Sequence, residues 1–143
     1  MERLKIPKKL LHKKIGVDSS ILIYLFNNEP KKSKKIAEIL SLSKKIVASS
    51  ILHLEIATGF YKKDKLPLID VLNNLPEICE NFEYVNADIK VCSIAAYLRS
   101  KYQFLKTPDA IHIATAILTK SDYFLTSDKK LSKISEIRVE TLR

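Results

Sequence analysis

Four acidic residues, Asp18, Glu55, Asp109 and Asp128, have types and positions that suit cation chemistry. Asp18 and Asp128 follow short apolar runs, and Asp109 follows a Thr-Pro pair that opens a helical pattern. A fold that gathers these carboxylates makes an all-oxygen site, with no Cys or His partner, and such a site favours Mg²⁺ or Mn²⁺ over Zn²⁺. The repulsion among the four would raise their pKa values unless a cation held them ionised.

Glu55 is the member of this set that a structural role explains least well. Each of the three aspartates stands at a predicted helix start, where a carboxylate can bind free backbone N–H groups. Glu55 instead lies inside a helical pattern between Leu54 and Ile56. A carboxylate buried there needs a partner, because an unpaired buried charge costs several kcal/mol. Gly59, one turn further on, is predicted to let another element approach this helix.

The elements that must position these acids alternate between short apolar strands and helices, which indicates an α/β fold with a parallel sheet. Asp18 and Asp128 then lie at the carboxyl ends of strands, where ligands bind in such sheets. Pro30 is expected to end the first helix and Pro76 to bound the fourth. The predicted strands span residues 15–17, 46–48, 82–85, 123–126 and 137–142, and the predicted helices span 21–26, 33–42, 51–62, 66–75, 87–102, 107–120 and 128–131.

The charge balance favours a polyanionic partner. Lys and Arg number 25 against 16 Asp and Glu, giving a formal net charge of +9. Nucleic acid is the leading candidate, and a basic surface that serves only solubility is the alternative. With only two glycines, the chain has no glycine-rich phosphate loop of the NTPase or dinucleotide type. Lysines that hold phosphates around an acidic cation pocket are typical of a nuclease.

The remaining features indicate one domain without a membrane segment. Cys79 and Cys92 form no metal-binding or disulfide pattern and are expected to be reduced core residues. Residues 1–14 lack the continuous apolar region of a signal peptide, and no apolar run approaches the roughly 20 residues of a membrane span. We therefore expect a soluble cytoplasmic protein, with a basic N-terminal extension over residues 1–13 and a single domain over residues 14–143.

Four sequence blocks carry a resemblance to a known family: IGVDSSILIYLF, ASSILHLEIATGF, TPDAIHIATAIL and FLTSDKKL. In order and spacing they resemble the PIN domain, especially the compact VapC-type toxins of toxin–antitoxin pairs. The resemblance implies an α/β/α sandwich with a mostly parallel five-stranded sheet. It also implies Mg²⁺- or Mn²⁺-dependent RNA hydrolysis that leaves a 5′-phosphate and a 3′-hydroxyl, a small antitoxin partner and a homodimer.

The resemblance also implies roles for individual residues. Asp18, Glu55, Asp109 and Asp128 match the family's four acids and are the expected catalytic and metal-binding residues, with Asp128 at the most variable position. Thr126 matches a hydroxyl often found at the pocket edge, and Ser19 is placed at the same edge.

Other functions remain open on the sequence alone. The chain could be a non-catalytic RNA-binding or adaptor protein with the same fold. A haloacid-dehalogenase-like phosphatase would need a second Asp where Ser20 stands, and a receiver domain would need paired acids near the first strand. His112 is expected to pack or be solvated rather than join the pocket, and Asp122 is expected to cap a strand end. Neither Ser19 nor Ser20 has a recognisable histidine base for a nucleophilic role.

Overall fold

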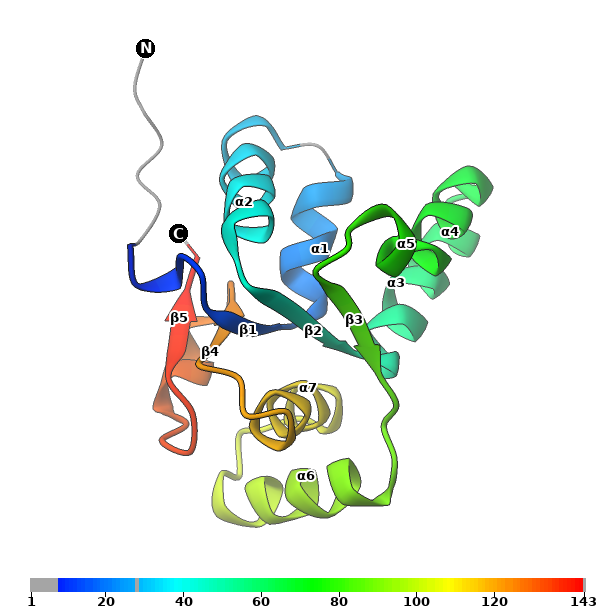
Figure 1. Ribbon diagram of the computed structural model, residues 1–143. Helices are drawn as coiled ribbons and strands as arrows, with labels where there is room; N and C mark the ends of the chain where they lie inside the picture. Colours follow the sequence, from blue (N-terminus) through cyan, green and yellow to red (C-terminus); the bar gives the residue numbers. More distant parts are fainter. Residues whose placement is uncertain (1–7, 28, 143) are drawn as a thin grey trace.

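A five-stranded, fully parallel sheet forms the centre of the molecule in the computed structural model, which describes residues 8–27 and 29–142. The strand order is β3-β2-β1-β4-β5 (Figure 1). The α/β class and the five strands are therefore confirmed, and every strand pair is parallel. The strands are β1 (Lys14–Val17), β2 (Lys45–Ser49), β3 (Phe82–Val85), β4 (Tyr123–Thr126) and β5 (Val139–Thr141).

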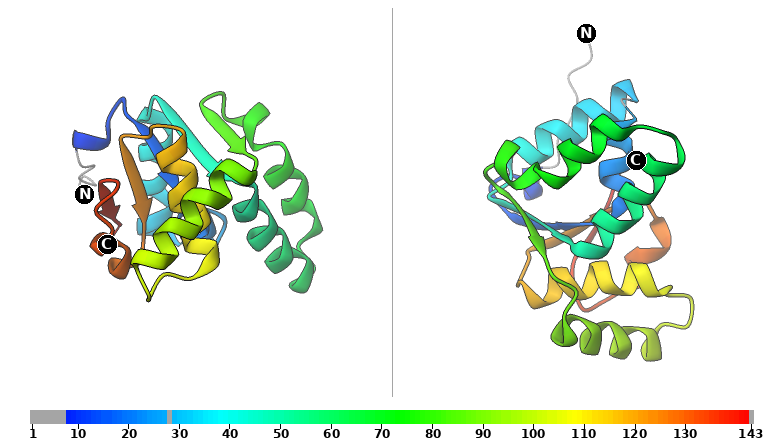
Figure 2. Two further views of the ribbon diagram at one scale, coloured as in Figure 1. Left: turned by 90° about the horizontal axis from the view of Figure 1, so that it is seen from below. Right: turned by 90° about the vertical axis from the view of Figure 1, so that its right-hand side faces the viewer.

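Helices cover both faces of the sheet, as expected for a parallel sheet whose strands are apolar on both sides (Figures 1 and 2). Helices α1 to α5 lie on one side, and α6 and α7 lie on the other. Two apolar cores result, one on each side. The helices are α1 (Ser19–Phe26), α2 (Pro30–Leu42), α3 (Ser50–Lys62), α4 (Leu66–Asn73), α5 (Leu75–Ile78), α6 (Ile89–Lys101) and α7 (Thr107–Leu118), with short 3₁₀ helices η1 (Lys8–Leu10) and η2 (Lys129–Lys133).

The glycine that permits a close approach is Gly16 in β1, not Gly59. A Cβ built on Gly16 would lie 2.5 Å from the Cβ of Ala116, so the missing side chain lets α7 sit directly on the central strand. At Gly59 a Cβ would meet nothing within 4 Å. The prediction that another element packs against Gly59 is therefore wrong. The close contact at Gly16 matters for the candidate site because α7 also carries Asp109.

Two prolines begin helices, whereas the sequence pattern predicts that they end them. Pro30 stands in the first turn of α2, so this helix begins three residues before its predicted start. Pro76 stands in the first turn of α5, so the single helix predicted over 66–75 is divided into α4 and α5. Proline suits the first helical turn because its missing N–H would have no partner there. In α7, Thr107 is the first helical residue, and Lys106 occupies the N-cap position.

The start of the described chain packs against the domain. Leu10 in η1 is buried in the apolar core, and Lys9 forms an ion pair of 2.6 Å with Glu140. Residues 1–7 of the predicted basic extension lie outside the described residues, and the boundary after residue 13 stays a prediction. The two cysteines are free but are not core residues, since Cys79 is half-buried and Cys92 is exposed. Within residues 8–27 and 29–142, no helix has the length and apolar character needed to cross a membrane.

Candidate active site

The topology brings the ends of neighbouring strands together at one edge of the sheet, which we call the carboxyl edge. Asp18 directly follows β1, and Asp128 lies two residues after β4, the strand that pairs with β1. Asp109 lies in the first turn of α7, and Glu55 lies in the second turn of α3. Carboxylates far apart in sequence thus come from four elements around this edge.

Asp18 is held by hydroxyl groups in a buried position. Only 4% of the residue is exposed. It occupies the N-cap position of α1, yet its side chain makes no capping hydrogen bond. Instead, Ser20 Oγ donates to Oδ1 and Thr126 Oγ1 donates to Oδ2, each over 2.5 Å. Burial raises the pKa of Asp18 above its ordinary value, and these two hydrogen bonds, with smaller effects of His112 and the Ile21 backbone, only oppose that rise. Hydroxyl donors, more than helix capping, therefore hold Asp18.

The same two hydroxyls tie the loop after β4 to Asp18. Thr126 Oγ1 accepts from the backbone N–H of Asp128 at 3.1 Å, and Ser20 Oγ accepts from that of Ser127 at 3.2 Å. Each hydroxyl thus donates to the carboxylate and accepts from the loop. The position of Asp128 is coupled to that of Asp18 through one side chain.

Glu55 has the partners that its place inside a helix requires. His112 Nε2 lies 2.7 Å from Glu55 Oε1, and Ser19 Oγ donates to the same oxygen over 3.2 Å. Its side chain is half-buried, with 35% exposed. Burial acts to raise the pKa of Glu55, but the hydrogen bonds from His112 and Ser19 outweigh this effect, and the pKa lies below its ordinary value. Glu55 is therefore held ionised.

Asp109 and Asp128 differ in how far they are buried: Asp109 is partly buried, whereas Asp128 lies at the surface. Burial raises the pKa of Asp109, and the carboxylates of Asp18, Asp128 and Glu55 raise it further. Asp109 is thus close enough to each of the other three acids to sense its charge. Asp128 is exposed, and its Oδ1 accepts from the backbone N–H of Lys130 at 3.0 Å, so it also caps η2.

The four acids suit a hard divalent cation in chemistry, but they do not form a closed ligand set. Their donors are all oxygen, as Mg²⁺ and Mn²⁺ prefer. The raised pKa values of Asp18 and Asp109 mean that ionising these groups is costly, and a bound cation would lower that cost. Over the described part of the chain, however, no three His, Cys, Asp or Glu side chains converge closely enough to hold a metal ion. Cation binding would require these carboxylates to move closer together.

Comparison with known families identifies the fold. The model of the PIN domain matches residues 15–137, which cover all four acids. The chain belongs to the PIN domain family. Comparison with curated proteins finds no match.

Solved structures share the PIN fold at low sequence identity. A chain in the crystal structure of VapBC2 from Rickettsia felis bound to a promoter DNA fragment has 16% identity and a TM-score of 0.70, over 91% of this chain and 99% of that one. A chain in a toxin–antitoxin complex from Klebsiella pneumoniae has 24% identity and a TM-score of 0.67, over 90% and 96%. A chain in the crystal structure of FitAcB from Neisseria gonorrhoeae has 21% identity and a TM-score of 0.64, over 88% of this chain and 95% of that one.

Within this PIN domain, the structure brings the predicted pocket-edge residues to the acids and adds two others. Thr126 contacts Asp18, and Ser19 contacts Glu55. Ser20, which the sequence does not place at the pocket edge, contacts Asp18. His112 is buried, and it reaches Glu55, so the expectation that it packs or is solvated away from the pocket is wrong. A sequence signal existed for His112, because it lies three residues after Asp109 on the same helical face.

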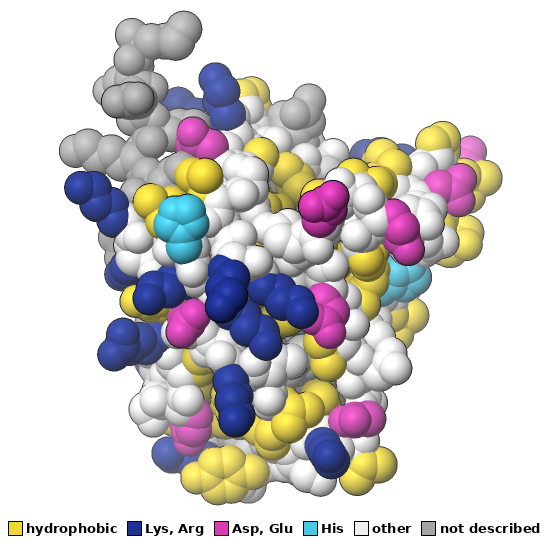
Figure 3. Space-filling model, viewed as in Figure 1, with side chains coloured by type: hydrophobic (Ala, Val, Ile, Leu, Met, Phe, Trp, Pro, Cys, Tyr) yellow, Lys and Arg dark blue, Asp and Glu magenta, His cyan; other side chains and the backbone are white. Residues whose placement is uncertain are grey.

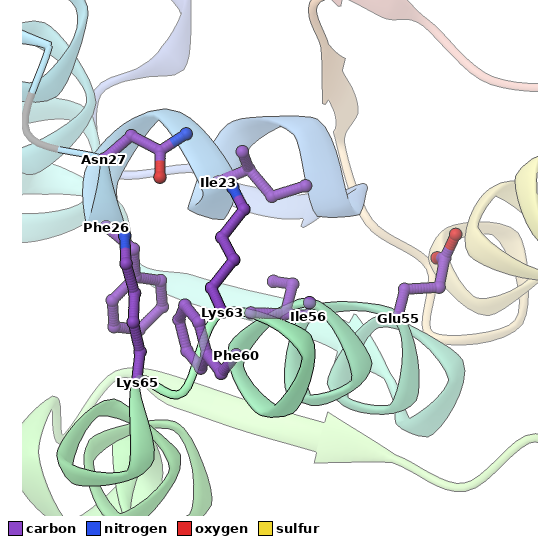
Figure 4. Close-up of a pocket in the computed structure, with 9 residues that line it drawn as sticks. Ile23, Phe26, Asn27, Glu55, Ile56, Phe60, Lys63 and Lys65 are labelled. Carbon is purple, nitrogen blue, oxygen red and sulfur yellow. The ribbon is translucent and has the colours of Figure 1, made fainter.

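A small, mainly apolar pocket lies beside the site, between α1 and α3 (Figure 4). Glu55 stands at the end of this pocket nearest α7, Lys65 stands at the other end, and Lys63 extends between them from α3 toward α1. The absence of a side chain at Gly59 leaves space in its wall. Its walls consist of Ile23, Phe26, Asn27, Ile56, Gly59 and Phe60.

Proposed function

We propose that this PIN domain is a Mg²⁺- or Mn²⁺-dependent endoribonuclease and the toxin of a toxin–antitoxin pair. The observation that supports it most strongly is the buried carboxylate of Asp18, which has two hydroxyl donors, no capping bond and a raised pKa. A buried acid whose pKa is raised by burial is typical of a functional site, because its ionised form costs stability.

Each acid would have a distinct task. Asp18, Glu55 and Asp109 would hold the cation, with Asp128 as the outermost member. When bound, the divalent cation would lower the pKa of a water molecule and stabilise the departing oxygen at the scissile phosphate. Ser20 and Thr126 would keep the Asp18 carboxylate in place, and Ser19 would do the same for Glu55.

Lysines at the carboxyl edge would hold the phosphate backbone of the RNA. Lys106 precedes α7 directly, and Lys129 and Lys130 begin η2, beside Asp109 and Asp128 respectively. All three lysines are exposed. Contacts to phosphates supply affinity without sequence information, so these residues would bind RNA without choosing the cleavage site.

The direct test is a cleavage assay on a structured RNA, with products separated on a denaturing gel. We expect cleavage with Mg²⁺ or Mn²⁺, none with EDTA, and none in Asp18→Asn. Asp122→Asn is a matched control, because the Asp122 carboxylate accepts from the backbone N–H of Lys14 at the opposite edge of the sheet. RNA binding without any product would instead favour a non-catalytic RNA-binding protein, and cleavage by Asp18→Asn would contradict the proposed site.

An antitoxin would find an apolar surface beside the site. Large apolar side chains of α1, α3 and α4 are exposed, and one of them, Ile23, lines the pocket. Exposed apolar surface commonly marks protein-binding sites. Co-expression with the product of a neighbouring gene, followed by co-purification, tests this partner. Light scattering on the purified chain tests the expected homodimer. The exposed apolar residues are Ile23, Leu54, Tyr61 and Leu66.

A further inference from the structure

His112 is a buried polar residue that contacts the proposed cation site. It is 2% exposed and lies one helical turn after Asp109. Its Nε2 reaches across from α7 to Glu55 Oε1 in α3, a partner 57 residues away in sequence, over 2.7 Å. The two helices that carry Glu55 and Asp109 are thus joined by one side chain.

The fold fixes where this imidazole lies. Ala116, one turn after His112, packs on Gly16, where even a single methyl group would collide with it. This contact sets the depth at which α7 sits on the sheet. Because His112 and Ala116 are four residues apart, they lie on the same face of the helix. The ring is therefore held from the sheet side and directed toward Glu55.

The hydrogen bonds around the ring define what His112 does. The carboxylate can only accept, so Nε2 carries the hydrogen in this contact. Within the described residues, Nδ1 is buried and has no hydrogen-bond partner. The one hydrogen bond that the ring makes among the described residues is therefore the bond from Nε2 to Glu55. His112 acts as a hydrogen-bond donor to Glu55.

Both hydrogen bonds to Glu55 reach the same oxygen. His112 and Ser19 donate to Oε1, while Oε2 receives no hydrogen bond from any residue that the structure describes. The carboxylate is thus fixed through one oxygen and left available through the other. Outer partners of this kind orient metal-binding carboxylates, and their loss typically weakens metal affinity by about 10- to 100-fold.

We propose that His112 is a positioning residue that fixes Glu55 through Oε1 and leaves Oε2 free for the cation. The inference rests on the proposed function, since it assigns a role toward the cation of that site. It differs from a packing role in one respect: it requires the hydrogen bond from Nε2, not only the volume of the ring.

The test compares His112→Leu with His112→Gln. Leucine fills the apolar surroundings but donates no hydrogen bond, whereas the amide nitrogen of glutamine can replace Nε2 as a hydrogen-bond donor. The readout is Mn²⁺ affinity measured by titration calorimetry without RNA, with thermal unfolding in EDTA as a check on folding. We expect Leu to weaken Mn²⁺ binding by about 10- to 100-fold and Gln to restore most of it. In a Glu55→Ala background, His112→Leu should cause no further loss.

The outcomes separate this inference from the proposed function. Wild-type affinity in His112→Leu would overturn the positioning role and leave the proposed function standing. Equal loss in the Leu and Gln variants, or a further loss in the Glu55→Ala background, would likewise show that the ring matters for packing alone. A wild-type protein that binds no Mn²⁺ would overturn both.

Discussion

Carboxylates at the two edges of the same sheet differ in how strongly they hold a proton. At the carboxyl edge, burial raises the pKa values of Asp18 and Asp109. At the opposite edge, where the strands begin and which we call the amino edge, Glu136 accepts from Tyr102 Oη at 2.6 Å and pairs with Lys101 at 2.9 Å. These contacts lower the pKa of Glu136 to about 2. An acid with neutralising partners stabilises the fold, whereas Asp18 and Asp109 cost stability.

The positive charge is distributed over both edges as well. Backbone hydrogen bonds hold Lys13 and Lys44 side by side, with Lys44 N–H donating to the carbonyl of Lys13 at 2.9 Å. Figure 3 shows Lys and Arg side chains gathered near the centre of one face of the molecule. The net charge of +9 therefore does not by itself indicate where RNA would bind. Exposed basic residues of the amino edge are Lys13, Lys44, Lys45, Lys120 and Arg138.

The largest difference between the edges should appear on removing one acid from each. Asp109→Asn should lower the cleavage rate by more than about 100-fold, since the cation contributes several kcal/mol to transition-state stabilisation. Asp122→Asn at the amino edge should cleave at the wild-type rate. Initial rates with a fluorescent RNA at saturating Mn²⁺ measure both. Comparable losses in the two variants would remove the functional distinction between the edges.

Asp109→Asn should also be at least as stable as the wild type when no cation is present. The pKa of Asp109 is raised in the folded state, so its ionised form opposes folding at neutral pH. Stability should therefore rise as the pH falls through the folded pKa, and this gain should be smaller in Asp109→Asn, where Asp18 still contributes. Urea unfolding in EDTA at several pH values measures it. A variant less stable than the wild type at pH 7 would mean that Asp109 has a structural role.

The carboxyl edge should also depend on how α7 sits on the sheet. Gly16→Val should lower the free energy of unfolding by about 1 to 3 kcal/mol and reduce cleavage, because its side chain would push Ala116 and the rest of α7 outward. Gly59→Ala is the matched control, with no neighbour within 4 Å. It should stabilise the helix by up to about 1 kcal/mol. Chemical unfolding and the cleavage assay are applied to both variants. A Gly16→Val variant with wild-type stability and cleavage would contradict the close packing of α7 on β1.

These two glycines show what the sequence could and could not predict. The strands and most helices followed from apolar runs and turn residues, because those signals are local. Gly59 attracted attention because glycine is costly inside a helix, while Gly16 in a short strand carried no comparable signal. Only the packing of α7 on β1 distinguishes them. Pro30 was misread for a related reason, since proline can either end a helix or begin the next one.

The sequence predicts the acids of the candidate site but not the residues that form hydrogen bonds with them. Asp18, Glu55 and Asp109 stood out by type and by the blocks around them. Their partners depend on contacts between distant segments, such as Thr126 with Asp18 over 108 residues. The sequence predicts a packed or solvated His112, and the residue is packed. Its contact with Glu55 depends on how α7 packs on the sheet. Sequence spacing does not encode such contacts.

A smaller effect should show which edge holds the RNA. Replacing Lys106 and Lys129 with Gln at the carboxyl edge should weaken RNA binding and lower the salt dependence, with the log–log slope falling by about 0.7 per lost phosphate contact. Replacing Lys13 and Lys44 with Gln at the amino edge changes the net charge by the same amount and should leave the slope unchanged. Both pairs are compared in Asp18→Asn, so that the RNA stays intact, by fluorescence anisotropy at several salt concentrations. Equal losses would show that the RNA contacts both edges.

The smallest effect should come from Glu136 at the amino edge. Its folded pKa of about 2 lies below the unfolded value of 4.5, so its stabilising contribution is present above pH 4.5 and is lost as the pH falls toward 2. Because Lys101 is exposed, solvent screens the pair, and Glu136→Gln should cost about 1 kcal/mol or less at neutral pH. Urea unfolding should show this cost shrinking between pH 4.5 and 2 while the cleavage rate stays at the wild-type level. Asp109→Asn is expected to show the reverse, with activity lost and stability kept, and a Glu136→Gln variant with impaired cleavage would mean that the amino edge also serves the reaction.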